Sequence, residues 1–493
     1  MGATDTHLGA TGCADTQLAD RAASSEGAST SGREYLAYFL HRHLDFRLPE
    51  LESLIEYEDK NASFSWRKPF GGCIYSPFWY LTLPSDGFAR QLCSRSMLLK
   101  GCFEVWGEGA TWEELQHAVN AYPEHQKLPW LASDMTMKVI VDGWGRVIQQ
   151  PEQLQYLKKL EFIPFKNPVK LAAPQVTFRL IVSNCYSDHG MPAEVPKRFY
   201  FTRQVSLCSH RDVIAQYGLP QRVYLGPTSM DTEMAFIMCN QAKVRKGHLV
   251  FDPFAGTGSI LIAAAHLGAH TLGSDIDIRV LRDGKTASDG QAVDNWSNFE
   301  VYKLQRPVGL IRADVHRSPF RSNLEEVLDA VVCDPPYGVR AGGRKSQSIP
   351  ERQIRDREKH ISATAPYFLG ECLRDLLHMS AKLLRLGGRL VYFLPAAPEV
   401  YREEEVPQHP ALQLVANSEQ VLSTKFSRRL ITMEKVKPYS ASDAEAYHEE
   451  QGDPRMAIDM LPSLIYEPRP IINGRKAPPN RALNGHTNRS KFC

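Results

Sequence analysis

The chain has 493 residues, of which 43% are hydrophobic and 23% charged, a composition typical of a globular protein with two to four domains. Its formal net charge is only +2, so bulk charge does not point to a nucleic-acid partner and any basic surface must be local. No apolar run approaches the roughly 18 residues of a membrane-spanning helix, so we expect no membrane span.

The ten cysteines are scattered along the chain, with no Cys-x-x-Cys pair and no paired Cys/His spacing. This pattern favours a reducing compartment over a disulfide framework. It also predicts that the chain has no zinc site or other metal site of its own.

The N-terminal half predicts an α+β region over residues 34–225, after a disordered tail over residues 1–33 that is rich in small polar residues. Apolar spacing predicts a helix over residues 34–57, in which Pro49 starts a new helix. Strands and helices alternate too irregularly beyond it for one simple layer. The expected strands are 77–83, 102–106, 135–141, 178–183 and 198–205, and the expected helices are 86–99, 112–121 and 153–160.

From residue 226 to residue 436, strands alternate with helices in the manner of a parallel α/β sheet. Strands are expected at 248–252, 269–275, 308–314, 328–334 and 389–395, with helices at 259–268, 276–284 and 364–386. Two strands, 412–421 and 429–435, then follow without a helix between them, which predicts a β-hairpin with one antiparallel strand at the end of the sheet. This is the strand plan of the Rossmann-like class I methyltransferases that use S-adenosylmethionine, a mostly parallel seven-stranded sheet with a terminal hairpin. Residues 437–493 lose this periodicity and predict a basic, disordered tail.

The first strand of this region runs into a glycine-rich turn and a helix, with Asp252 at the strand end and Gly256 and Gly258 in the turn. Glycines allow a ligand to approach the backbone, and the free N–H groups of a helix N-terminus can bind a carboxylate. Asp275 and Asp314 end the next two strands, where they can accept hydrogen bonds from ribose hydroxyls and from an adenine amino group. Each acid alone is more often a strand-end cap, but three at consecutive strand ends predict a nucleoside cofactor.

The fourth strand ends in Asp334-Pro335-Pro336-Tyr337. The prolines restrict the backbone so that the Pro335 carbonyl and the Asp334 carboxylate can accept the two hydrogens of a planar amine, and Tyr337 can stack on a base. This arrangement predicts methyl transfer to an exocyclic amine, catalysed mainly by positioning and electrostatics. Asp334 can take the released proton, although transfer to water remains open.

A glycine-rich, basic loop follows Tyr337 and contains Arg340, Arg344 and Lys345. Directly over the expected acceptor site, these residues are candidates for binding substrate phosphates. A solvated loop whose cations pair with Glu351, Asp356 and Glu358 is the alternative reading.

Five motifs together resemble the catalytic subunit family of the eukaryotic tRNA guanosine-10 N2-methyltransferases. They are Gly226-Pro-Thr-Ser-Met-Asp231, the turn from Phe251 to Gly258, Gly273-Ser-Asp-Ile-Asp277, Asp334-Pro-Pro-Tyr-Gly-Val-Arg340 and the stretch from Ser427 to Lys435. The resemblance covers roughly residues 34–436 and implies a THUMP tRNA-binding domain within residues 34–225.

The resemblance further implies methylation of the 2-amino group of guanosine 10 in cytoplasmic tRNA, with S-adenosyl-L-methionine as methyl donor. The cofactor positions that it implies are Thr228, Ser229, Asp252, Pro253, Phe254, Gly256, Thr257, Gly258, Asp275 and Asp314, and the catalytic positions are Asp334, Pro335, Pro336 and Tyr337. It implies a heterodimer with a small zinc-finger activator subunit. An apolar edge strand at residues 308–311 would suit such a partner.

Other functions remain open from the residues. A DNA adenine or cytosine amino-methyltransferase would use the same Asp-Pro-Pro-Tyr motif, but residues 34–225 show no DNA-recognition signature. A protein glutamine methyltransferase would usually carry Asn in place of Asp334. An RNA-binding scaffold with an inactive methyltransferase fold would not need Asp275, Asp314 and Asp334 together.

Overall fold

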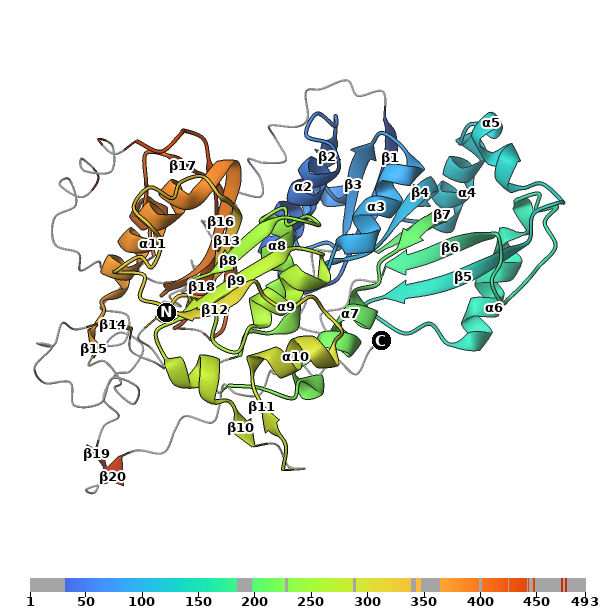
Figure 1. Ribbon diagram of the computed structural model, residues 1–493. Coiled ribbons are helices and arrows are strands. Elements are labelled where there is room, and N and C mark those ends of the chain that lie inside the picture. The colour runs from blue at the N-terminus through green and yellow to red at the C-terminus, as the bar shows by residue number, and fades with distance from the viewer. Residues whose placement is uncertain are drawn as a thin grey trace, which may run out of the picture.

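A computed structural model describes residues 32–183, 197–226, 229–286, 290–337, 343–346, 364–398, 401–423 and 425–440, with residues 442, 447, 471–472 and 475–476. Two seven-stranded sheets lie beside each other, with helices between them (Figure 1). The expected tails, residues 1–33 and 437–493, fall almost entirely outside the described residues. Within the described part, no helix is both long and apolar enough to cross a membrane.

The first sheet has the strand order β2-β3-β1-β4-β7-β6-β5. All of its pairs are antiparallel except β5 with β6. Its strands are β1 (Arg33–Phe39), β2 (Ser65–Arg67), β3 (Phe78–Leu83), β4 (Leu99–Gly109), β5 (Met137–Trp144), β6 (Val176–Ser183) and β7 (Arg198–Leu207). Its helices are α2 (Arg47–Glu58), α3 (Asp86–Arg95), α4 (Trp112–Ala121), α5 (Glu124–Lys127), α6 (Gln150–Lys159) and α7 (His210–Tyr217).

Two predictions for this region were wrong. Residues 34–39 form the strand β1 instead of the start of a helix, since β1 lies between β3 and β4 and buries side chains on both of its faces, as Tyr35 and Leu36 show. A fully buried strand is apolar throughout and cannot be told from a buried helix by periodicity. The strands also join one sheet, because pairing between β4 and β7 connects the early strands to the late ones.

The second sheet has the order β12-β9-β8-β13-β16-β18-β17. Its strands are β8 (Leu249–Asp252), β9 (His270–Asp275), β12 (Gly309–Arg312), β13 (Leu328–Cys333), β16 (Leu384–Ala396), β17 (Leu412–Val421) and β18 (Ser427–Lys435). The first five in spatial order are parallel, and β18 runs antiparallel to β16 and β17. The predicted hairpin is therefore confirmed, but its antiparallel strand is β18, one place in from the edge.

Helices cover both faces of this sheet (Figure 1). The helices α8 (Thr232–Gln241), α9 (Ser259–His266) and α10 (Asn295–Val301) lie on the side of the first sheet, and α11 (Leu369–Leu383) packs on the opposite face. The helix expected at 276–284 is one π-helical turn, Arg279–Asp283. The helix expected at 364–386 begins only at Leu369, because Thr364–Pro366 forms β15, which pairs with β14 (Arg344–Ser346).

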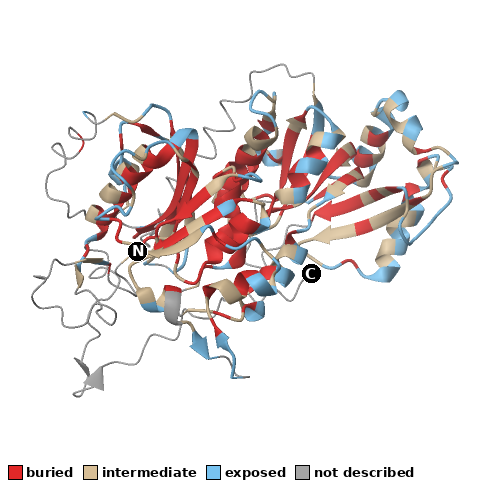
Figure 2. Ribbon diagram, in the orientation of Figure 1, coloured by how far each residue is buried: buried red, intermediate tan, exposed pale blue. Residues whose placement is uncertain are grey.

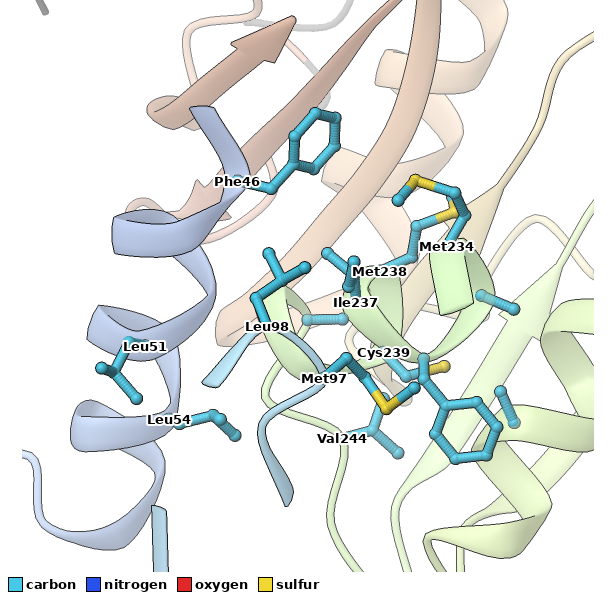
Figure 3. Close-up of a cluster of buried hydrophobic side chains, with 14 of the residues drawn as sticks. Phe46, Leu51, Leu54, Met97, Leu98, Met234, Ile237, Met238, Cys239 and Val244 are labelled. Atoms are coloured by element: carbon cyan, nitrogen blue, oxygen red, sulfur yellow. The ribbon is translucent and has the colours of Figure 1, made fainter. Parts of the chain in front are cut away.

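The two sheets share one apolar core, visible as a continuous buried zone in Figure 2. Figure 3 shows Leu98 beside Ile237 of α8 and Met97 beside Cys239, and Leu51 and Leu54 of α2 belong to the same buried cluster. Burying apolar surface from both halves stabilises their relative placement.

Polar contacts reinforce this packing. Glu50 of α2 is fully buried and accepts hydrogen bonds from the Ser96 hydroxyl (2.9 Å), the Met97 and Leu98 backbone N–H groups (2.8 and 3.1 Å) and the Asn240 amide of α8 (2.8 Å). A buried carboxylate needs such donors in place of water. Glu50 therefore ties the N-terminal helix to the second sheet.

A second polar link surrounds Arg389 of β16, whose side chain is buried. Its guanidinium donates to Glu56 of α2 (2.6 Å), to Glu434 of β18 (2.9 Å) and to the Ser53 hydroxyl (2.9 Å). Lys243 pairs with both of these acids at 3.2 and 3.0 Å. The cluster joins α2 to the strands β16 and β18 of the second sheet.

Candidate active site

Four acids stand at the carboxyl ends of four adjacent strands of the second sheet. In the spatial order β12, β9, β8 and β13, these are Asp314, Asp275, Asp252 and Asp334. Ligands of open α/β sheets bind at this edge. The structure thus brings together the acids that the sequence places at successive strand ends.

The turn after β8 is shaped by Asp252, whose carboxylate accepts from the Phe254 N–H at 3.0 Å. Asp252 is only 1% exposed, and burial, together with the Asp275 and Asp334 carboxylates, raises its pKa well above the ordinary value. Its side chain therefore organises the turn and presents almost no surface of its own.

The two turn glycines adopt left-handed backbone angles, with φ of +50° at Gly256 and +77° at Gly258. Gly258 immediately precedes α9, and a Cβ on it would lie 3.3 Å from the Asn295 side-chain oxygen. Asn295 also donates to the Gly256 carbonyl at 3.0 Å, so α10 holds the turn in place. This backbone allows a ligand to approach closely.

Asp275 is linked to the same turn. Its carboxylate accepts from the Gly256 N–H at 3.0 Å and from the Asp277 N–H at 2.9 Å. Burial raises the pKa of Asp275, while these two backbone donors counteract that effect. Each carboxylate oxygen keeps a lone pair for a further donor, as two ribose hydroxyls would require. Asp277 faces away, since it pairs with Arg279.

Asp314 is buried and accepts from two backbone N–H groups, that of His316 at 3.0 Å and that of Ser346 at 2.6 Å. Ser346 belongs to β14, so Asp314 connects the end of β12 to the paired strands β14 and β15. Both oxygens retain acceptor capacity for an amino group.

The acceptor motif follows β13 directly. Asp334 has a side chain that is 27% exposed, yet its Oδ1 atom is buried and has no hydrogen-bond partner among the residues that the structure describes. Within the same described residues, the hydroxyl of Tyr337 is also buried without a partner. Burial raises the pKa of Asp334 to about 6, and Arg428 of β18, whose Nη1 lies 3.7 Å from Oδ2, opposes that rise. Buried polar atoms without partners are uncommon and mark a place where a ligand can supply them.

The motif Gly226–Asp231 also contacts the turn. The Ser229 hydroxyl lies 2.9 Å from that of Thr257, and a Cβ on Gly226 would come within 3.0 Å of the Thr257 methyl group. Ser229 and Thr257 are thus brought together with the strand-end acids, while Thr228 lies outside the described residues.

The basic loop is described only in part, and Arg340 lies outside the described residues. Arg344 is exposed on β14, where it can meet a substrate. Lys345 instead donates to Glu371 of α11, so its charge is already paired.

Two residues of this site escaped the sequence analysis. Asn295 sits on α10, which was not predicted, so no motif signalled it. Arg428 belongs to the stretch Ser427–Lys435, which carried the family resemblance but no assigned role. Where side chains are described, no group of three or more His, Cys, Asp and Glu residues is arranged to hold a metal ion.

Comparison with known proteins gives a consistent result. Residues 33–211 match the family described as the Tmrp11 THUMP N-terminal domain, and residues 220–349 match the RMKL-like methyltransferase domain. The tRNA (guanine(10)-N(2))-methyltransferases of Mus musculus and Homo sapiens are each 38% identical to this chain, over 83% of it and 89% of their own lengths. The enzyme of the same name from Dictyostelium discoideum is 33% identical over 83% of each chain. Among solved structures, TrmN from Thermus thermophilus covers 82% of this chain and 100% of its own at 16% identity, with a TM-score of 0.38.

Proposed function

Because the chain belongs to the family of tRNA (guanine(10)-N(2))-methyltransferases, we propose that it methylates the exocyclic 2-amino group of guanosine 10 in tRNA, with S-adenosyl-L-methionine as methyl donor. The observation that carries this proposal is the buried Oδ1 of Asp334, which lies beside three other strand-end acids and has no hydrogen-bond partner in the described part of the chain. An acceptor amine brings the hydrogens that this atom lacks.

The residues around the turn fit the cofactor. Gly256 and Gly258 leave the backbone open, and α9 presents its N-terminus where a carboxylate can bind. Asp275 has spare acceptor capacity for two hydroxyls, and Asp314 for an amino group. Ser229 and Thr257 add hydroxyls beside the turn.

The bound cofactor supplies an electrophilic methyl group on a sulfonium sulfur. The chain's own residues must hold a weakly nucleophilic amine, whose lone pair is delocalised into the guanine ring, in line with that group. Asp334 Oδ1 accepts one amine hydrogen, the Pro335 carbonyl accepts the other on a backbone restricted by two prolines, and Tyr337 lies against the base. Holding the amine in this way accelerates the transfer by positioning and by electrostatic stabilisation of the charge that develops.

The protonation state of Asp334 suits this role. With a pKa of about 6, its carboxylate is mostly ionised at neutral pH and accepts hydrogen bonds from the amine. As the nitrogen becomes cationic, the same carboxylate can take the released proton, or the proton can leave to water.

We further propose that the chain works as the catalytic subunit of a heterodimer in the cytoplasm. In support, β12 is an edge strand with all four residues half-buried, and the preceding Val308 is 67% exposed. A bare apolar edge favours strand addition by a partner, here the small zinc-finger activator subunit. Seven cysteines described by the structure are free thiols, as expected of a reducing compartment.

The test is methyl incorporation from labelled S-adenosyl-L-methionine into an unmodified tRNA transcript, with a guanosine-10 to adenosine transcript beside it. The protein is co-purified with the zinc-finger subunit. We expect label in the first transcript only, and none with the Asp334→Ala variant. Equal labelling of both transcripts would refute the target base, and labelling of duplex DNA instead would favour the DNA amino-methyltransferase. No label at all, with folded protein and bound cofactor, would favour the inactive scaffold.

A further inference from the structure

The side chains of two neighbouring arginines of β18, Arg428 and Arg429, lie on opposite faces of the second sheet. Arg429 is buried, donates to the Asn417 side chain at 2.6 Å and lies over the Tyr401 ring at 4.2 Å. Arg428 instead faces the loop after β13, where Asp334 stands. Adjacent residues of a strand point to opposite faces, so the two arginines provide a natural comparison.

The guanidinium of Arg428 is held firmly by its own neighbours. It stacks over the Phe393 ring of β16 at 3.9 Å, and its Nε donates to the Gln420 side chain of β17 at 2.7 Å. Nη2 lies 4.0 Å from the Met230 sulfur. Phe393 and Gln420 belong to the strands on the two sides of β18, and Nη1 faces a carboxylate.

That carboxylate is Asp334, with Nη1 3.7 Å from Oδ2. The distance is too long for a direct hydrogen bond but well within reach of a strong charge interaction. Arg428 thus faces one oxygen of the carboxylate, and the other oxygen, Oδ1, is buried and without a hydrogen-bond partner where the structure describes the chain.

We propose that Arg428 is a positioning residue for methyl transfer, which holds Asp334 through Oδ2 and keeps the carboxylate ionised so that Oδ1 can accept the target amine. This inference rests on the proposed function and assigns a role to a residue that does not itself touch the reacting atoms.

Arg428 favours the ionised form of Asp334. Burial disfavours the ionised carboxylate, and the Arg428 cation opposes this effect. Arg428 is the one ion-pair partner of Asp334 among the residues that the structure describes. Asp231 also interacts with Arg428 and stabilises its cation. Removal of Arg428 therefore leaves burial unopposed, and the pKa of Asp334 must rise.

The test is the pH dependence of single-turnover methyl transfer, at saturating cofactor and tRNA, for the parent complex and its Arg428→Gln variant. We expect the acid limb of the profile, near pH 6 in the parent, to move upward by about 1 pH unit or more in the variant. At pH 7 the rate should fall roughly two- to tenfold and recover as pH rises. A fall that is equal at every pH would indicate a structural role alone and overturn the proposal.

Two variants separate charge from packing. Arg428→Lys keeps the cation and should restore most of the acid limb, whereas Arg429→Gln removes a buried arginine from the opposite face and should leave the limb in place. An Arg429→Gln profile shifted as far as that of Arg428→Gln would refute the specific pairing with Asp334.

A second readout does not depend on activity. Since the folded-state pKa of Asp334 is raised from 3.8 to about 6, its carboxyl destabilises the fold increasingly between these two pH values, and Asp334→Asn removes this effect. The stability difference between parent and Asp334→Asn should therefore grow over this window and level off above about pH 6, and the pH at which it levels off should move upward in the Arg428→Gln background. An unmoved upper limit overturns the inference. If the parent methylates no tRNA, the proposed function fails and this measurement still decides the role of Arg428.

Discussion

Replacing Asp334 by Asn should make the protein more stable and nearly inactive at the same time. The substitution keeps the shape of the side chain but removes its negative charge. The carboxylate has a pKa of about 6 in the fold, against an ordinary value of 3.8, because burial disfavours its ionised form. That difference corresponds to about 3 kcal/mol of destabilisation when the group is ionised. This value is an upper bound, since the side chain is 27% exposed.

The sign of the pH dependence follows from the raised pKa. Below the ordinary pKa the carboxyl is neutral in both folded and unfolded states, so it costs the fold nothing. Between pH 3.8 and about 6 the unfolded state releases the proton while the folded state keeps it, so stability falls over this window and levels off above it. The gain in free energy of unfolding for Asp334→Asn should therefore be largest at pH 8 and shrink as pH falls through about 6.

Activity should change in the opposite direction. The amide can turn an N–H toward the target amine, and it is a weaker acceptor than a carboxylate, so the transfer rate should fall by about 10²- to 10³-fold. Urea denaturation at pH 8 and pH 5 measures the stability, and single-turnover methyl transfer measures the rate. A variant that is less stable than the parent at pH 8, or one that keeps its rate, would refute this reasoning.

Three further substitutions test other parts of the structure. Asp275→Asn should weaken cofactor binding by about 10- to 100-fold in calorimetric titration, because it removes a charged acceptor for two hydroxyls, and unchanged affinity would argue against ribose binding there. Gly258→Ala should lower the stability by about 1 kcal/mol, because the residue has a left-handed backbone and its Cβ would approach Asn295. The same substitution should also weaken cofactor binding. Gly247→Ala is the control: its φ is +82° and nothing described lies near its Cβ, so it should lose stability alone. Glu50→Ala should reduce the free energy of unfolding in urea by about 3 kcal/mol or more, because four donors lose their buried acceptor, and a loss below about 1 kcal/mol would mean that water replaces the carboxylate.

Much of the second sheet could be predicted because its signals are local. A strand, a glycine turn and a helix occupy adjacent residues, and the acids Asp252, Asp275 and Asp334 stand at strand ends in the order in which the chain visits them. The hairpin of β17 and β18 was equally visible as two strands without a helix between them. The roles of these acids remain predictions, whereas their positions follow from topology.

What could not be predicted depends on contacts distant in sequence. The strand β1 is decided by its neighbours β3 and β4, and its apolar residues fit a buried helix just as well. Residues 364–366 fit the start of a helix, and only their pairing with β14 makes them the strand β15. Glu50 and Arg428 carry no local motif, since their partners, Asn240 and Asp334, lie in other elements.

The core shared by the two sheets has a consequence for the history of this protein. Leu51 and Leu54 belong to the N-terminal half, yet they lie in the same core as Met234 and Met238 of the second half (Figure 3). Neither half therefore has a complete core of its own. A fragment with only the catalytic half would expose an apolar face that promotes aggregation. Recombination with a different N-terminal module would succeed only if that module brought a matching face. The two halves must therefore be inherited together, and compensating substitutions across their boundary should accumulate in pairs.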